Sequence, residues 1–161
     1  MKRGFRRRRY LSLREPVTDA WFLVRNAAGV FRMLIKGTIP PAFRERLMLA
    51  VTGVYGCRFC TWIHTREALR SGLTAEGVTT LLDGTVEGCP AEEALAVLYA
   101  QHWADSGANP TPESARMLVD SYGKEKAQAV NLVLRMIRMG NLSGNSLDYL
   151  LYRVSFGRLK G

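Results

Sequence analysis

The spacing of apolar residues constrains the fold of this 161-residue chain more than any other feature. Apolar side chains recur at intervals of three and four residues, and no convincing alternation of apolar and polar residues is present. Such intervals place side chains on one face of an α-helix, whereas alternation is typical of a half-buried strand. Glycine and proline fall at the ends of these segments, where helices end or begin. The pattern therefore predicts an all-α fold.

This pattern and its punctuation predict eight helices. They span residues 18–36, 40–55, 57–70, 74–84, 91–105, 112–121, 124–139 and 146–154. Thr18, Thr74 and Ser146 are expected N-caps, because a hydroxyl at that position accepts a backbone N–H of the first turn. Gly140 is expected to end the seventh helix, and residues 141–145 are expected to form a turn.

Charge divides the chain into two regions. Hydrophobic residues make up 47% and charged residues 23%, which is typical of a globular domain rather than a disordered chain. Residues 1–15 contribute +6 of the total net charge of +9. We expect a basic arm and an N-terminal helix in residues 1–37, followed by a helical domain in residues 38–161. The high net charge therefore describes the arm and indicates little about the function of the domain.

The basic arm has three interpretations. We expect it to be solvated, with its helix packed on the domain or on a sister subunit. Attachment to a membrane surface is an alternative, because aromatic residues such as Trp21 and Phe31 accompany the basic segment. Contact with nucleic-acid phosphates is another, but the arginines form no recognition motif, so no specific nucleic-acid partner is expected. The apolar stretch 20–35 contains Arg25 and Arg32 and is too short to span a bilayer.

The cysteines indicate a cytoplasmic location. An odd number of cysteines makes a poor disulfide framework in a chain of this size and favours free thiols in a reducing compartment; they are Cys57, Cys60 and Cys89. Consecutive arginines at positions 7–9 are similar to a twin-arginine export signal. However, charged Arg14 and Glu15 follow where such a signal has an apolar region, so we do not expect export.

Cys57 and Cys60 lie where a helix is expected to begin. The free N–H groups and the positive dipole end of a helix N-terminus stabilise a thiolate, and Arg58 adds positive charge. His64 follows Cys60 by four residues, so it shares one side of the helix and can exchange a proton with a thiol. Glu45 lies on the preceding helix. If that helix packs antiparallel, Glu45 comes near the dithiol and can orient His64 or relay its proton.

Less reactive interpretations of the same residues remain open. A single C-x-x-C on a helix is often structural or half of a metal site. Zinc could bind Cys57, Cys60 and His64, but a fourth ligand would have to come from Cys89 or His102. Cys89 is more typical of a packed loop cysteine and His102 of a residue at a packing edge. Glu45 alone is typical of a solvated helix residue.

Taken together, the motif resembles a known family. Glu45, Cys57, Cys60 and His64 follow a pattern similar to that of the alkylhydroperoxidase D-like (AhpD-like) branch of the carboxymuconolactone decarboxylase family, and Gly56 precedes the first cysteine. The resemblance covers residues 38–85 well and later helices only in general pattern, and residues 1–36 are expected to fall outside it. It implies an all-α, AhpD-like domain that assembles as a homotrimer or a larger oligomer and reduces hydroperoxides without a cofactor.

The resemblance also implies a role for each residue. Cys60 would be the peroxidatic thiol that becomes sulfenic acid, and Cys57 would resolve it to a disulfide. His64 and Glu45 would form the proton relay, and an unidentified thiol or lipoyl-type reductant would restore the dithiol. Phe59 departs from the pattern, because a histidine occupies this position in the best-studied branch. A structural or metal-binding module, or a carboxymuconolactone-type decarboxylase, is the alternative; decarboxylase members typically lack the C-x-x-C pair.

Overall fold

The computed structural model describes residues 5–156, and within that range it contains helices and no strands. The all-α prediction is confirmed. The helices are α1 (Arg14–Arg25), α2 (Ala27–Lys36), α3 (Pro41–Tyr55), α4 (Arg58–Arg70), α5 (Ala75–Leu82), α6 (Ala91–Asp105) and α7 (Pro112–Val154). None of the helices in the described range is long and apolar enough to cross a bilayer.

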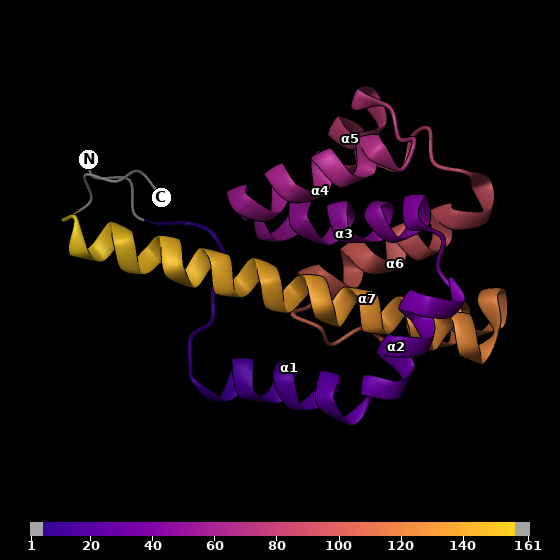
Figure 1. Ribbon diagram of the computed structural model, residues 1–161, viewed down its shortest axis with the longest axis horizontal. Coiled ribbons are helices and arrows are strands. Elements are labelled where there is room, and N and C mark those ends of the chain that lie inside the picture. The colour runs from indigo at the N-terminus through magenta and orange to yellow at the C-terminus, as the bar shows by residue number, and fades with distance from the viewer. Residues whose placement is uncertain (1–4, 157–161) are drawn as a thin grey trace.

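The helices form layers on either side of α7. In Figure 1, α7 runs the length of the molecule, α3, α4 and α5 lie on one side of it, α1 lies on the other, and α2 crosses α7 in this view. The central helix is α3, which packs against α4, α5, α6 and α7. Its buried side chains lie on every face, since the consecutive residues Leu47, Met48, Leu49 and Ala50 are all buried. A helix that is apolar all round belongs in the core.

The turn between α3 and α4 sets the two helices antiparallel (Figure 1). Gly56 ends α3 in the left-handed conformation, with φ 69°, and its N–H donates to Thr52 O at 2.7 Å. Cys57 then takes the N-cap position of α4. These boundaries agree with the sequence prediction, because a glycine and a capping side chain mark them clearly.

The prediction of one helix over residues 18–36 is wrong. The structure bends the chain at Asn26, with φ −105° and ψ 17°, and gives two helices. The Asn26 side chain donates to Phe22 O at 2.8 Å and so competes with continued helix formation. Thr18 is not an N-cap, since α1 begins at Arg14 and the Thr18 hydroxyl donates to Arg14 O within the helix.

The predicted stop at Gly140, the turn at 141–145 and the cap at Ser146 are also wrong. The backbone stays helical through this region to Val154. The side chain of Asn141 donates to Thr52 Oγ1 at 3.1 Å and that of Asn145 to Tyr55 O at 2.9 Å. These contacts with α3 use buried asparagines inside a helix rather than in a turn. The break predicted between 121 and 124 is confirmed by non-helical Gly123.

The expectation of a solvated arm is corrected by the contacts of residues 5–13, called here the N-terminal arm. Arg7 pairs with Asp148 at 2.8 Å, and the Arg8 guanidinium donates to Ala104 O at 3.0 Å. The Tyr10 hydroxyl donates to Asp19 Oδ2 at 2.8 Å, and this buried carboxylate also accepts from two arginines of α7. These pairs hold the N-terminal arm along the surface of the helical domain, so it does not extend into water.

Candidate dithiol site

Cys57 and Cys60 lie together at the N-terminal end of α4. Cys57 is the N-cap residue, and its Sγ accepts the backbone N–H of Cys60 at 3.4 Å. Both side chains are nearly buried, with Cys57 1% and Cys60 6% exposed. A sulfur at this position faces the free N–H groups and the positive dipole end of the helix, which favour a thiolate over a thiol.

The two thiols have different pKa values because they are hydrogen-bonded to each other. The pKa of Cys57 is lowered to about 6, first by the hydrogen bond from the Cys60 thiol and then by the backbone N–H groups of Cys60 and Phe59, against the opposing effect of burial. The same hydrogen bond, together with burial, raises the pKa of Cys60. The pair therefore shares one negative charge, which resides on Cys57 while Cys60 keeps its proton.

Glu45 and His64 lie within hydrogen-bonding distance across the α3–α4 turn. Glu45 Oε2 is 2.8 Å from His64 Nδ1, and the carboxylate is buried at 3% exposure. An ionised Glu45 accepts the Nδ1 proton, which leaves the lone pair on Nε2. Since His64 follows Cys60 by one turn of α4, it stands on the same side of the helix as that cysteine.

Helix α7 also packs against the dithiol, a contact that the sequence did not predict. A side-chain carbon on Gly144 would lie 2.8 Å from Cys57 Sγ, which is closer than a real contact allows. One on Gly140 would lie 4.0 Å from Cys60 Sγ, an ordinary contact. Gly144 therefore lets α7 pass directly against the dithiol. The helical spacing of residues 140, 144 and 145 is the sequence feature that indicates a continued helix. The two glycines and two asparagines in this segment favour a turn instead, so the sequence alone does not predict the contact.

An exposed aromatic pair flanks the cysteines. Phe59 and Trp62 are 64% and 60% exposed, and their rings stack with centroids 6.3 Å apart. The position at which Phe59 departs from the family pattern therefore lies on the surface of α4.

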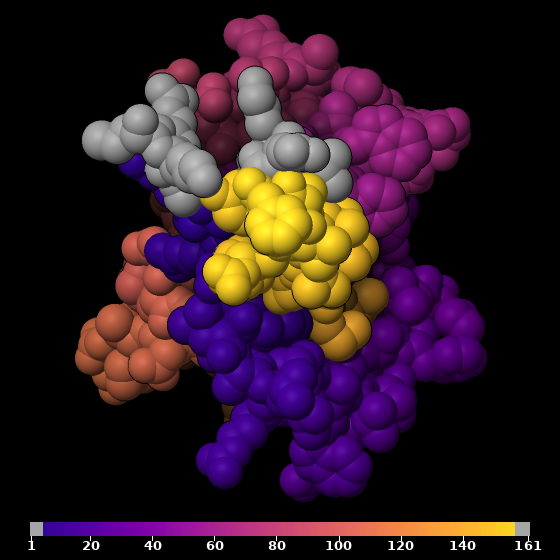
Figure 2. Space-filling model, turned by 90° about the vertical axis from the view of Figure 1, so that its left-hand side faces the viewer, coloured from indigo at the N-terminus to yellow at the C-terminus, as the bar shows by residue number. Residues whose placement is uncertain are grey.

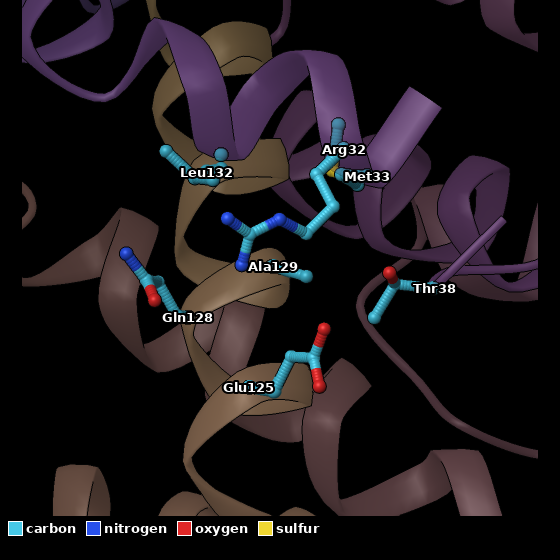
Figure 3. A pocket seen from close by; sticks show the side chains of 8 residues that line it. Arg32, Met33, Thr38, Glu125, Gln128, Ala129 and Leu132 are labelled. Atoms are coloured by element: carbon cyan, nitrogen blue, oxygen red, sulfur yellow. The ribbon is translucent and has the colours of Figure 1, made fainter. Parts of the chain in front are cut away.

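Two small cavities lie elsewhere in the described part of the chain, and neither is lined by Cys57 or Cys60. One of about 20 Å³ lies between α2 and α7, where Arg32 reaches toward Gln128 and Glu125 (Figure 3). It is large enough for little more than a water molecule. Another of about 120 Å³ lies beside the start of α5 and is lined in part by Arg46 and Cys89.

The structure does not bring the remaining candidate ligands to the dithiol. Cys89 is half-buried in the loop before α6, where burial raises the pKa of its thiol. His102 is exposed on α6. Among residues 5–156, no group of three or more histidine, cysteine or acidic side chains is arranged to hold a metal ion.

The motif and the helical fold agree with a comparison against known families. Residues 19–102, slightly more than half of the chain, match the profile of the carboxymuconolactone decarboxylase family. The chain belongs to this family. The resemblance inferred from the motif is thereby confirmed, since the family includes AhpD-like proteins. The matched segment contains Glu45 and both cysteines of the motif, and it begins within α1, so residues 19–36 fall inside the family match and not outside it as expected. No curated protein and no solved structure matches the chain closely enough to extend this assignment.

Proposed function

We propose that this member of the carboxymuconolactone decarboxylase family is a thiol-dependent peroxidase that reduces hydroperoxides through Cys57 and Cys60. The observation that carries the proposal is the Cys57 sulfur at the N-terminus of α4, hydrogen-bonded to Cys60, with the His64–Glu45 pair on the same pair of helices. A low thiol pKa, a second thiol in contact and a base oriented by a carboxylate are the groups that peroxide reduction requires.

In the proposed reaction, Cys60 is the peroxidatic thiol. Its sulfur attacks the outer peroxide oxygen, the O–O bond breaks, and His64 Nε2 takes the thiol proton and passes it to the departing alkoxide as alcohol. Cys60 becomes a sulfenic acid. The Cys57 thiolate then attacks the Cys60 sulfur, and hydroxide leaves as water after taking a proton. A thiol or lipoyl-type dithiol supplies the two electrons and two protons that restore the pair.

The low pKa of Cys57 suits the resolving role. A resolving thiol reacts as a thiolate, and Cys57 is already ionised near neutral pH. It also suits the return step, because the sulfur with the lower pKa leaves faster when a disulfide is reduced. Cys60 in turn is the more exposed of the two and lies one helical turn from the base.

Peptide mapping of reduced protein before and after one equivalent of cumene hydroperoxide tests the proposal. Trypsin cleaves after Arg58 and so places Cys57 in peptide 47–58 and Cys60 in peptide 59–66. We expect these peptides to become linked by a disulfide, with one peroxide consumed per chain. Cys57→Ser should stop at a sulfenic acid on Cys60, and Cys60→Ser should consume no peroxide.

The third cysteine provides the matched control. Cys89→Ser removes a half-buried thiol outside the dithiol and should leave peroxide consumption and the disulfide unchanged. Thiols that stay reduced under excess peroxide would contradict the proposal. Sulfenic acid trapped on Cys57 in the Cys60→Ser variant, with peroxide still consumed, would exchange the roles of the two cysteines.

A decarboxylase is the second candidate, because the family takes its name from that activity and the buried Glu45–His64 pair does not depend on the thiols. Turnover of a lactone acid would survive Cys60→Ser and disappear with His64→Ala. The dithiol mechanism gives the opposite result for Cys60→Ser, so assays of this variant with a lactone acid and with a hydroperoxide distinguish the two activities.

A further inference from the structure

The N-terminal arm reaches the turn that positions Cys57. Figure 2 looks onto this end of the molecule, where the last turns of α7 (yellow) lie between the indigo N-terminal segment and the magenta residues of α4. A side-chain carbon on Gly56 would lie 3.6 Å from Arg7 Cγ, so the stem of Arg7 packs against this glycine. Asn145 fixes the arm here, because its side chain donates to both Arg8 O and Tyr55 O.

Arg7 is the better-shielded cation of the two that pair with Asp148. Arg7 Nη1 lies 2.8 Å from Asp148 Oδ2, and the two side chains are 16% and 26% exposed. Arg58 lies 3.5 Å from the same oxygen but is 63% exposed. Solvent and salt screen the exposed pair more than the shielded one. Arg7 therefore contributes most of the neutralisation of Asp148.

Asp148 follows Gly144 by one turn of α7, so it lies on the face of that helix that packs against Cys57 Sγ. Its charge raises the pKa of Cys57, since a carboxylate disfavours a second negative charge nearby. Tyr55 stays neutral, because burial raises the pKa of its phenol. The titratable and charged groups around Cys57 are Arg7 of the arm, Tyr55 of α3, Arg58 and Cys60 of α4, and Asp148 of α7.

We propose that Arg7 is a positioning residue of the dithiol, which holds Asp148 in an ion pair and so weakens the opposition of this carboxylate to a thiolate at Cys57. Arg7 acts through Asp148 and does not touch the reacting sulfur. Both residues lie outside the matched segment 19–102, so the family assignment does not supply this role. The inference deepens the proposed function, since it concerns the same thiols. It makes no assumption about which substrate they reduce.

Thiol titration of the full chain tests this role without any peroxide. The midpoint of the first thiolate ionisation is measured by ultraviolet absorbance, and alkylation by iodoacetamide followed by tryptic mapping assigns it to peptide 47–58. We expect Arg7→Gln to raise the midpoint by about half a pH unit, which slows alkylation of Cys57 about threefold below that midpoint. Arg7→Lys keeps the charge and should keep the midpoint. Asp148→Asn should lower it.

The double variant shows whether Arg7 acts through Asp148. Arg7→Gln combined with Asp148→Asn should give the midpoint of Asp148→Asn alone, because no carboxylate remains to be neutralised. Arg6→Gln is the matched control, since it removes the same charge from an exposed arm residue and should leave the midpoint unchanged. An unchanged midpoint in Arg7→Gln, or an equal shift with and without Asp148, would overturn the inference.

Three further outcomes are decisive. If Arg7→Gln does not fold, as judged by circular dichroism, folded Asp148→Asn decides alone, and an unchanged midpoint in that variant overturns the inference. If the shifts occur but no peroxide is consumed, the proposed function fails while the role of Arg7 stands. If peroxide is consumed and no shift occurs, only the role of Arg7 fails.

Discussion

At the scale of single residues, the Glu45–His64 contact is the feature that favours the proposed reactive site over two helices that merely pack together. A carboxylate at 3% exposure, with its oxygen 2.8 Å from an imidazole nitrogen, fixes the orientation of the ring. Sequence spacing suggested that Glu45 could reach the dithiol only if the two helices were antiparallel. The tight turn at Gly56 supplies that geometry.

His64→Ala is expected to slow sulfenic acid formation roughly a hundredfold, because a general base is lost from the attack step. Glu45→Gln should shift the pH dependence of the same rate, since an amide does not hold the Nδ1 proton as a carboxylate does. Stopped-flow measurement of peroxide consumption over a range of pH tests both variants. Glu93→Gln is the control, because Glu93 is also shielded and paired, with Arg46 at 2.8 Å, but lies on α6. An unaltered profile for Glu45→Gln would make Glu45 a structural residue.

The lowered pKa of Cys57 predicts how reactivity depends on pH. The pKa of about 6 lies below the ordinary value for a thiol, so the thiolate persists at neutral pH and is lost as the pH falls through 6. Alkylation of peptide 47–58 should therefore decrease about tenfold for each pH unit below that point. Cys57→Ser should remove this ionisation from the ultraviolet titration, whereas Cys89→Ser should keep it. A first midpoint in the ordinary thiol range would contradict the prediction.

At the scale of helices, the sequence predicted the elements where a local signal was sufficient. The bounds of α4, α5 and α6 follow from a capping side chain or a proline at each start, and α3 from proline at its first turn. The first part of α7 is predicted equally well from the sequence, because Pro112 marks the start of the helix and Gly123 marks its kink. Its C-terminal half was misjudged, because glycine and asparagine favour turns when only the sequence is considered.

Tertiary contacts explain the continuity of α7. The amide of Asn141 reaches Thr52, and that of Asn145 reaches the backbone of α3 and of the arm. These hydrogen bonds satisfy side chains that would otherwise prefer a turn, and they need partners that lie between 89 and 137 residues away in sequence. Gly140 and Gly144 keep helical backbone without positive φ, so their small size matters here rather than their flexibility.

Gly144→Ala is therefore expected to destabilise the fold by about 1–3 kcal/mol, because its new methyl group overlaps Cys57 Sγ. Gly140→Ala is the matched control on the same helix. Its methyl group meets Cys60 Sγ at 4.0 Å. It should stabilise the fold by roughly 0.5–1 kcal/mol through better helix propensity. Urea unfolding measures both free energies, and dithiol oxidation should slow only in Gly144→Ala. Equal free energies of unfolding for the two variants would contradict this account of the α7 contact.

At the scale of the whole molecule, the all-α architecture was predictable and the arrangement of its N-terminal region was not. Helical periodicity is local, so it survives in the sequence alone. The placement of the arm depends on pairs such as Arg7 with Asp148 and Arg8 with Asp105, which join it to α7 and to the end of α6. A run of arginines does not indicate which acidic residues they pair with, and for that reason the sequence alone favours a solvated arm.

The exposed apolar surface of α1 and α2 predicts self-association. Six large apolar side chains on these helices are between 49% and 67% exposed: Val17, Trp21, Val24, Phe31, Leu34 and Ile35. Exposed large apolar side chains that gather on two consecutive helices are typical of an interface. The motif resembles a family of homo-oligomers, so we expect a second copy of this chain to cover the surface, and a trimer or a larger assembly to form.

Sedimentation equilibrium of the full chain measures this assembly directly. Phe31→Glu should shift the distribution toward monomer, because a carboxylate buried at an interface without a partner is costly. Leu98→Glu is the matched control, since Leu98 is a similarly exposed apolar residue, at 51%, on α6. It should leave the assembly unchanged. A monomeric wild type at micromolar concentration would contradict the expectation, and an equal loss of assembly in both variants would place the interface elsewhere.

The dithiol lies at the turn between α3 and α4, so Phe31→Glu should leave the pKa of Cys57 unaltered. Assembly and thiol chemistry can therefore be tested separately.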